Sequence, residues 1–146
     1  MRELMGEALR LGIRIHLAHL NEIEPGLLGF YDHDDSAIYV EIGLTRAERR
    51  EVIAHELGHA KYCHTCESAT GERQANRYAA SLLVDPDAYA RAESISHDVA
   101  FIAEELDVTP QIVLDYQHYC IEKIGLVTYV DPRMGEGQWA ARAALA

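Results

Sequence analysis

The chain has 146 residues, of which 49% are hydrophobic, and this suits one globular domain rather than a disordered chain. Its 24 acidic residues against 13 lysines and arginines give a formal net charge of −11, which disfavours nucleic acid as a direct ligand and suits a basic protein partner. No stretch resembles a membrane span or a signal peptide, and three cysteines suggest no disulfide framework, so we expect a cytoplasmic protein.

The beginning of the chain predicts a short helix followed by a small sheet. The helix is expected over residues 2–11. Apolar and polar side chains then alternate over 13–20, as in a half-buried strand, and two further strand-like segments cover 26–32 and 37–42. We therefore expect a small antiparallel or mixed sheet.

Helical periodicity replaces this alternation after residue 44. Thr45 and Glu48 have the spacing of a capping box, which predicts a helix over 46–63. A second helix is expected over 71–85, because a proline follows and cannot continue it.

Two shorter helices and a tail are predicted for the rest of the chain. Ser96 is expected to cap a helix over 97–106, and Thr109, followed by a proline, a helix over 110–122. This pair forms a helix-turn-helix-like appendix. The predicted core, appendix and C-terminal tail cover three ranges: 1–90, 91–124 and 125–146.

The segment HELGH, residues 55–59, places two histidines one helical turn apart. His55 and His59 therefore project from the same face of the predicted helix, where two imidazoles can bind one zinc ion. Glu56 follows the first of them, where its carboxylate can reach a water on the metal and act as general base. The alternative is an amphipathic helix with solvated histidines.

A third ligand is predicted on the second helix. In ERQANRYAASLL, Glu72 lies on the apolar stripe of the helix, and a carboxylate on a buried face is costly unless a cation pairs with it. A zinc ion held by the two histidines would be such a partner. Asn76, one turn further, could orient a ligand imidazole. Alternatively, Glu72 caps its helix or pairs with an arginine.

Two motifs in combination resemble the ImmA/IrrE family of metallopeptidases, which is common in phages and mobile elements of bacteria. They are LLGFYDHDDSAIYVEIGLTRAERREVIAHELGHAKYCH and ERQANRYAASLLVDP, and the resemblance covers roughly residues 26–110. It implies Glu56 as general base and three zinc ligands: His55, His59 and Glu72. It also implies that the substrate is a helix-turn-helix repressor, whose cleavage switches on the repressed genes. LLVDP departs from the family's usual LLMP, and the CxxC at Cys63 is not part of the pattern.

Other residues compete for a metal ion. His64 lies five positions after His59 and points about 140° away on a regular helix, so it could bind only if the helix ends first. A non-catalytic interaction protein could instead hold a structural zinc ion, although the second cysteine pair of a zinc ribbon is missing. The ligands of that site would be Cys63, Cys66, Cys120 and His118 or His64.

The appendix raises the possibility of a DNA-binding regulatory module. Residues 91–124 carry only Arg91 and Lys123 as basic side chains, against seven acidic ones. A recognition helix that begins at Pro110 without lysine or arginine would be a poor reader of phosphates. We therefore expect the appendix to pack on the core or to dock the substrate.

The predicted fold is α+β. A small N-terminal antiparallel or mixed sheet packs on a zincin-type HExxH helix and a second ligand helix, and a helix-turn-helix-like appendix follows. The predicted function is a zinc-dependent endopeptidase that cleaves a repressor protein. The strand over 38–42 is expected to offer its edge to an extended substrate. Four side chains are candidates for stabilising the oxyanion: Tyr78, Tyr62, His64 and His97.

Overall fold

The computed structural model describes residues 1–63, 68–124 and 127–130. The chain divides into two compact units, Met1–Ala79 and Ala80–Ala146. The boundaries predicted at residues 90 and 124 stay predictions. No described helix is both long enough and apolar enough to cross a membrane.

A mixed sheet of three strands forms the base of the first unit. The strands are β1 (Arg14–Ala18), β2 (Gly29–Asp32) and β3 (Ala37–Glu41), in the order β1-β3-β2. β3 pairs in parallel with β1 and antiparallel with β2. The prediction that this strand offers its edge to a substrate is therefore wrong, because the backbone groups of β3 are paired on both sides.

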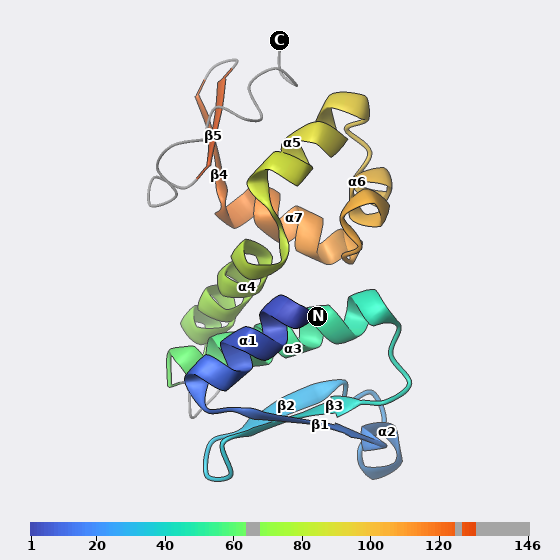
Figure 1. Ribbon diagram of the computed structural model, residues 1–146, viewed down its shortest axis with the longest axis vertical. Helices are drawn as coiled ribbons and strands as arrows, with labels where there is room; N and C mark the ends of the chain where they lie inside the picture. The colour runs from blue at the N-terminus through green and yellow to red at the C-terminus, as the bar shows by residue number, and fades with distance from the viewer. Residues whose placement is uncertain (64–67, 125–126, 131–146) are drawn as a thin grey trace. The chain divides into compact units, whose positions relative to one another are not determined.

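Helices α1 (Arg2–Leu11) and α3 (Arg46–Lys61) lie over one face of this sheet (Figure 1). The centre of the core is made by side chains that are almost fully buried: Ile38 and Val40 of β3, and Ile53 and Leu57 of α3. A short helix, α2 (Leu20–Ile23), follows β1 and takes the end of the segment that was predicted to be strand. The buried Leu20 anchors this turn of helix beside β3.

The capping box of α3 is confirmed. The hydroxyl of Thr45 accepts a hydrogen bond from the Glu48 amide at 3.3 Å, and the Glu48 carboxylate accepts one from the Thr45 amide at 2.8 Å. The helix ends at Lys61, two residues before the predicted end. Cys63 then has a φ of 55°, a left-handed conformation that stops the helix.

The next helix, α4 (Ala69–Leu83), approaches α3 closely. A Cβ atom on Gly58 of α3 would lie 2.8 Å from the Cα of Ala75. Two helix backbones can come this near only where a glycine meets a small residue. This contact sets the separation of the two helices that carry the candidate metal ligands.

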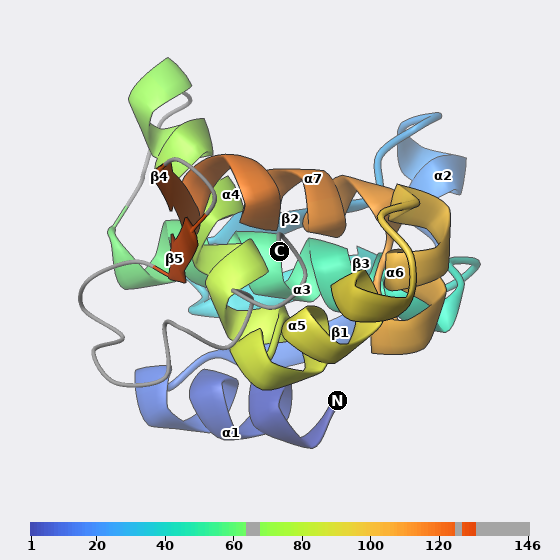
Figure 2. The same cartoon turned by 90° about the horizontal axis from the view of Figure 1, so that it is seen from above.

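Three helices and a hairpin make up most of the second unit. Helices α5 (Pro86–Ile95), α6 (Val99–Leu106) and α7 (Pro110–Tyr119) are grouped together (Figure 2). Strands β4 (Ile121–Ile124) and β5 (Val127–Val130) pair antiparallel. Strand β5 thus covers residues 127–130 of the predicted loose tail, and the predictions for residues 131–146 lie outside the described residues.

Helix α5 was not predicted from the sequence, and the predicted N-cap of α6 is wrong. Asp85 is the N-cap of α5, and its carboxylate accepts a hydrogen bond from the Ala88 amide at 2.9 Å. Ser96 does not cap α6, because Asp98 takes that place and accepts from the Phe101 amide at 3.0 Å. The Thr109 cap of α7 is confirmed, at 3.2 Å from the amide nitrogen of Ile112. The fold as a whole is α+β, as predicted, with seven helices among the described residues.

Candidate metal centre

The structure brings together the three residues that were predicted to bind a metal, His55, His59 and Glu72. One ligand atom from each lies within 4.8 Å of the others. The Nε2 atoms of the two imidazoles are 3.0 Å apart. One carboxylate oxygen of Glu72 lies 3.2 Å from Nε2 of His55, and the other lies 3.1 Å from Nε2 of His59. At these distances the three groups can either exchange hydrogen bonds through N–H protons or bind one metal ion together.

The distances within this cluster suit zinc. Two ligands of a tetrahedral zinc ion, each bound at about 2.0–2.1 Å, lie roughly 3.3 Å apart. The donor set of two imidazoles and one carboxylate is also one that catalytic zinc sites use. The three side chains could therefore hold zinc after only a small adjustment.

The three ligands differ in exposure. The side chains of His55 and His59 on α3 are 22% and 15% exposed, whereas that of Glu72 is 47% exposed. The expectation that Glu72 is buried on the apolar stripe is thus met only in part, because it lies near the start of α4, at the rim of the cluster. The imidazoles are thus the more buried ligands, and the cluster is accessible to solvent on the side of the Glu72 carboxylate.

Glu56 is half-buried beside the cluster. Burial raises the pKa of its carboxyl group and the nearby Glu72 carboxylate adds to this rise, while His55 and a hydrogen bond from the backbone amide of Tyr31 lower it. Tyr31 belongs to β2, so a backbone amide of this strand holds the Glu56 carboxylate. A bound cation would oppose the rise, because positive charge favours the ionised form.

The sequence of this chain matches a known protein family. The model of the Peptidase_M78 family, described as the IrrE N-terminal-like domain, matches residues 8–115 of the 146. This chain belongs to the Peptidase_M78 family. No match was found among curated proteins or among solved structures.

Membership of Peptidase_M78 confirms the resemblance that the motifs indicated and supports a peptidase. The matched range includes both site helices. It contains all four predicted site residues: His55, Glu56, His59 and Glu72. Their individual roles stay predictions.

The residue that was predicted to support the candidate metal site is Asn76. It is half-buried on α4, and no hydrogen bond of its side chain is seen among the described residues. Its orienting role stays a prediction.

The hydrogen bond from Tyr31 to Glu56 could not be predicted from the sequence, because a backbone amide makes it and no side-chain pattern reveals it.

The competing metal sites use cysteines and histidines other than His55 and His59. His64 and Cys66 lie outside the described residues. Cys63 is exposed in the first unit, and Cys120 is buried in the second. A structural zinc ion on the cysteines therefore stays an untested alternative.

Three of the four candidates for stabilising the oxyanion can be placed. Tyr62 is 40% exposed. His97 is exposed in the second unit, where its Nδ1 lies 3.8 Å from Glu93. The hydroxyl of Tyr78 donates to Glu7. His64 lies outside the described residues.

Replacement of Gly58 by alanine should weaken both the fold and the metal site. Its new methyl group would meet the backbone of Ala75, so α4 must move, and overpacking of this kind costs about 1–3 kcal/mol. That exceeds the gain of roughly 0.5–1 kcal/mol that alanine brings to a helix interior. Chemical unfolding and zinc titration would measure the two effects.

Gly6→Ala is the matched control for this prediction. Gly6 also lies in a helix, but a Cβ atom there would meet nothing within 4 Å, so the variant should be neutral or slightly more stable. Equal stability and equal zinc affinity in Gly58→Ala and Gly6→Ala would contradict the role of the close approach.

Proposed function

We propose that this protein is a zinc-dependent endopeptidase. The observation that carries the proposal is the cluster of His55, His59 and Glu72, whose facing nitrogen and oxygen atoms lie 3.0–3.2 Å apart and suit a zinc ion. Three protein ligands leave one tetrahedral position open, as in catalytic rather than structural zinc sites. Family membership supports the same class of reaction.

The metal ion and the residues beside this cluster have separate roles in peptide hydrolysis. Zinc, when bound, supplies a Lewis acid that activates water and polarises the scissile carbonyl group. Glu56 takes a proton from the attacking water and gives it to the departing amine. The Tyr31 amide orients the Glu56 carboxylate for both transfers.

We place an extended substrate along β2 rather than β3. The amide of Glu41 donates to the carbonyl of Leu28 at 2.8 Å, so every second residue of the β2 segment, namely Phe30 and Asp32, turns its backbone groups toward β3. Gly29 and Tyr31 therefore turn theirs toward the outer edge, where the Tyr31 amide meets Glu56. A peptide that pairs with this edge would run past the general base.

The test of this function is cleavage that depends on zinc. The purified protein should cut a helix-turn-helix repressor, lose that activity after dialysis against a chelator, and regain it when zinc is restored. Wild-type protein and a His59→Ala variant would be compared by mass spectrometry of the products. Cleavage that survives complete removal of the metal, or that is unchanged in His59→Ala, would refute the proposal.

We also propose that the substrate is a basic, DNA-binding repressor that is attracted over a distance. The chain carries a net charge of −11, and its α6–α7 segment includes the exposed acidic residues Glu104, Glu105 and Asp107. Attraction between oppositely charged surfaces speeds encounter and is screened beyond about 10 Å at 0.1 M salt. The association rate should therefore fall as ionic strength rises.

A charge-neutral variant tests this second proposal. Glu104 and Glu105 are replaced by glutamine and Asp107 by asparagine, because Asp107 has a φ of 53° and asparagine tolerates that left-handed conformation. Stopped-flow association would be compared at several salt concentrations. An association rate that is the same at every ionic strength, and the same in the variant, would show that these charges serve only solubility.

A further inference from the structure

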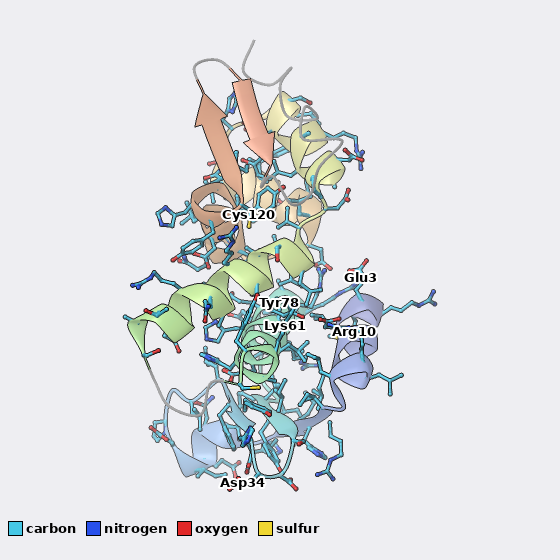
Figure 3. The ribbon with its side chains drawn as sticks, turned by 90° about the vertical axis from the view of Figure 1, so that its left-hand side faces the viewer. Glu3, Arg10, Asp34, Lys61, Tyr78 and Cys120 are labelled. Atoms are coloured by element: carbon cyan, nitrogen blue, oxygen red, sulfur yellow. The ribbon has the colours of Figure 1, made fainter. Side chains whose placement is uncertain are left out.

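A buried phenol in the first unit contacts two neighbouring helices. Tyr78 of α4 is only 7% exposed, and its hydroxyl donates a hydrogen bond to the carboxylate of Glu7 on α1. Lys61, the last residue of α3, places its ammonium group 4.7 Å from the centre of the Tyr78 ring. Tyr78 and Lys61 lie together, with Arg10 of α1 beside them (Figure 3).

The carboxylate that accepts this bond is itself held firmly. Arg10 donates to Glu7 through Nε at 2.9 Å and through Nη2 at 2.6 Å. These bonds lower the pKa of Glu7 to about 2, against the opposing effect of burial and with further help from the Tyr78 hydroxyl and Lys61. Burial, followed by the bond to Glu7, raises the pKa of Tyr78. A neutral phenol therefore donates to an ionised carboxylate, and such charge-assisted bonds are stronger than neutral ones.

This contact acts on the helix that carries Glu72. Glu72 lies six residues before Tyr78 on α4, which is about 9 Å along a helix axis. The approach of Ala75 to Gly58 fixes how far α4 lies from α3. A directional hydrogen bond from Tyr78 to α1 adds a constraint on the rotation of α4 about its axis.

We propose that Tyr78 is a positioning residue of the metal site. Its hydrogen bond to Glu7 fixes the rotation of α4 and so places the Glu72 carboxylate against His55 and His59. The inference rests on the proposed zinc site, because it assigns to Tyr78 an effect on metal affinity. It also gives the Tyr78 hydroxyl a use other than stabilisation of an oxyanion.

The experiment uses Tyr78→Phe, which removes the hydroxyl and keeps the ring. Zinc affinity would be measured by competition with a chelator, without any substrate. We expect Tyr78→Phe to weaken zinc binding by about tenfold, the equivalent of roughly one hydrogen bond. In a double-mutant cycle, the losses of zinc affinity in Glu7→Ala and Tyr78→Phe should not add. Each single variant should show much of the loss of zinc affinity that the double variant shows.

Tyr39→Phe is the matched control. The Tyr39 hydroxyl also donates to a carboxylate in the same unit, that of Asp35 at 3.1 Å, but this bond lies at the sheet and not on α4. Tyr39→Phe should leave zinc affinity within twofold of the wild type. A zinc affinity of Tyr78→Phe within twofold of the wild type would overturn the proposal, and so would an equal loss in both variants.

Hydrogen exchange of the metal-free protein separates this inference from the proposed function. If the hydroxyl holds α4 in place, Tyr78→Phe should accelerate amide exchange over residues 72–79 by about tenfold, whereas Tyr39→Phe should not. If the wild type binds zinc no better than Glu72→Ala does, the proposed function fails and the exchange rates alone decide whether Tyr78 fixes α4. Unchanged exchange in Tyr78→Phe would overturn that role as well.

Discussion

Replacement of Glu56 by glutamine is expected to lower the rate of repressor cleavage by about 10²–10⁴, the range that general acid–base catalysis contributes. The amide has the shape of the carboxylate but cannot accept the proton of the attacking water. Its carbonyl oxygen can still accept the hydrogen bond from the Tyr31 amide, so the local structure should be kept. Single-turnover kinetics with the repressor would measure the effect.

Zinc content is the control for this variant. Glu56→Gln should bind zinc as the wild type does, because Glu56 is not one of the three ligand residues. A variant that has lost its zinc would say nothing about proton transfer, whereas one that keeps zinc and cleaves at nearly the wild-type rate would rule out Glu56 as the general base.

Replacement of Glu72 by alanine should weaken zinc binding by more than about 100-fold, since the loss of an outer partner of a metal ligand already costs 10–100-fold. Only two imidazoles would remain to hold the ion. The wild type should contain one zinc ion per chain by metal analysis. Competition with a chelator would rank the variants by affinity.

His64→Ala and Cys66→Ser are the comparison variants for Glu72→Ala. Neither residue is assigned a bond to the catalytic metal, so both variants should keep the wild-type affinity. The reverse ranking would make His64 the third ligand and Glu72 a structural carboxylate. Two zinc ions per chain would instead reveal a second site on the cysteines.

The local part of the candidate site could be predicted because it depends on one helical turn. His55 and His59 share a face of α3 whatever the rest of the fold does, and Thr45 with Glu48 begins that helix through contacts three residues apart. Glu72 was found from the poor fit of a carboxylate to an apolar stripe, although its side chain proves half exposed. In each case the decisive signal lies within one helix.

The order of the strands could not be predicted, because it depends on which strands pair across the chain. Three short segments with a turn between the last two fit an antiparallel meander as well as the observed order. The bond between Tyr78 and Glu7 joins residues 71 positions apart and leaves no mark on the local sequence. The prediction that β3 offers its edge to a substrate is wrong because the strand order places β3 in the centre of the sheet.

The misassigned helix boundaries have a simpler cause. Pro86 predicts the end of α4, but proline also fits the first position of the next helix, where Asp85 caps α5. Ser96 and Asp98 are both good capping residues two positions apart. The structure uses Asp98, and the hydroxyl of Ser96 accepts a hydrogen bond from the Asp98 amide at 3.1 Å.

The central position of β3 has a consequence for the order of folding. β2 and β3 are joined by a short turn and can form a hairpin early, whereas β1 must wait until β3 has been made before it can pair in parallel with it. During synthesis, β1 is therefore exposed as an unpaired strand while some twenty residues emerge from the ribosome. Arg14 and His16 in this strand disfavour its association with other nascent chains, because charged and polar side chains protect an open strand edge.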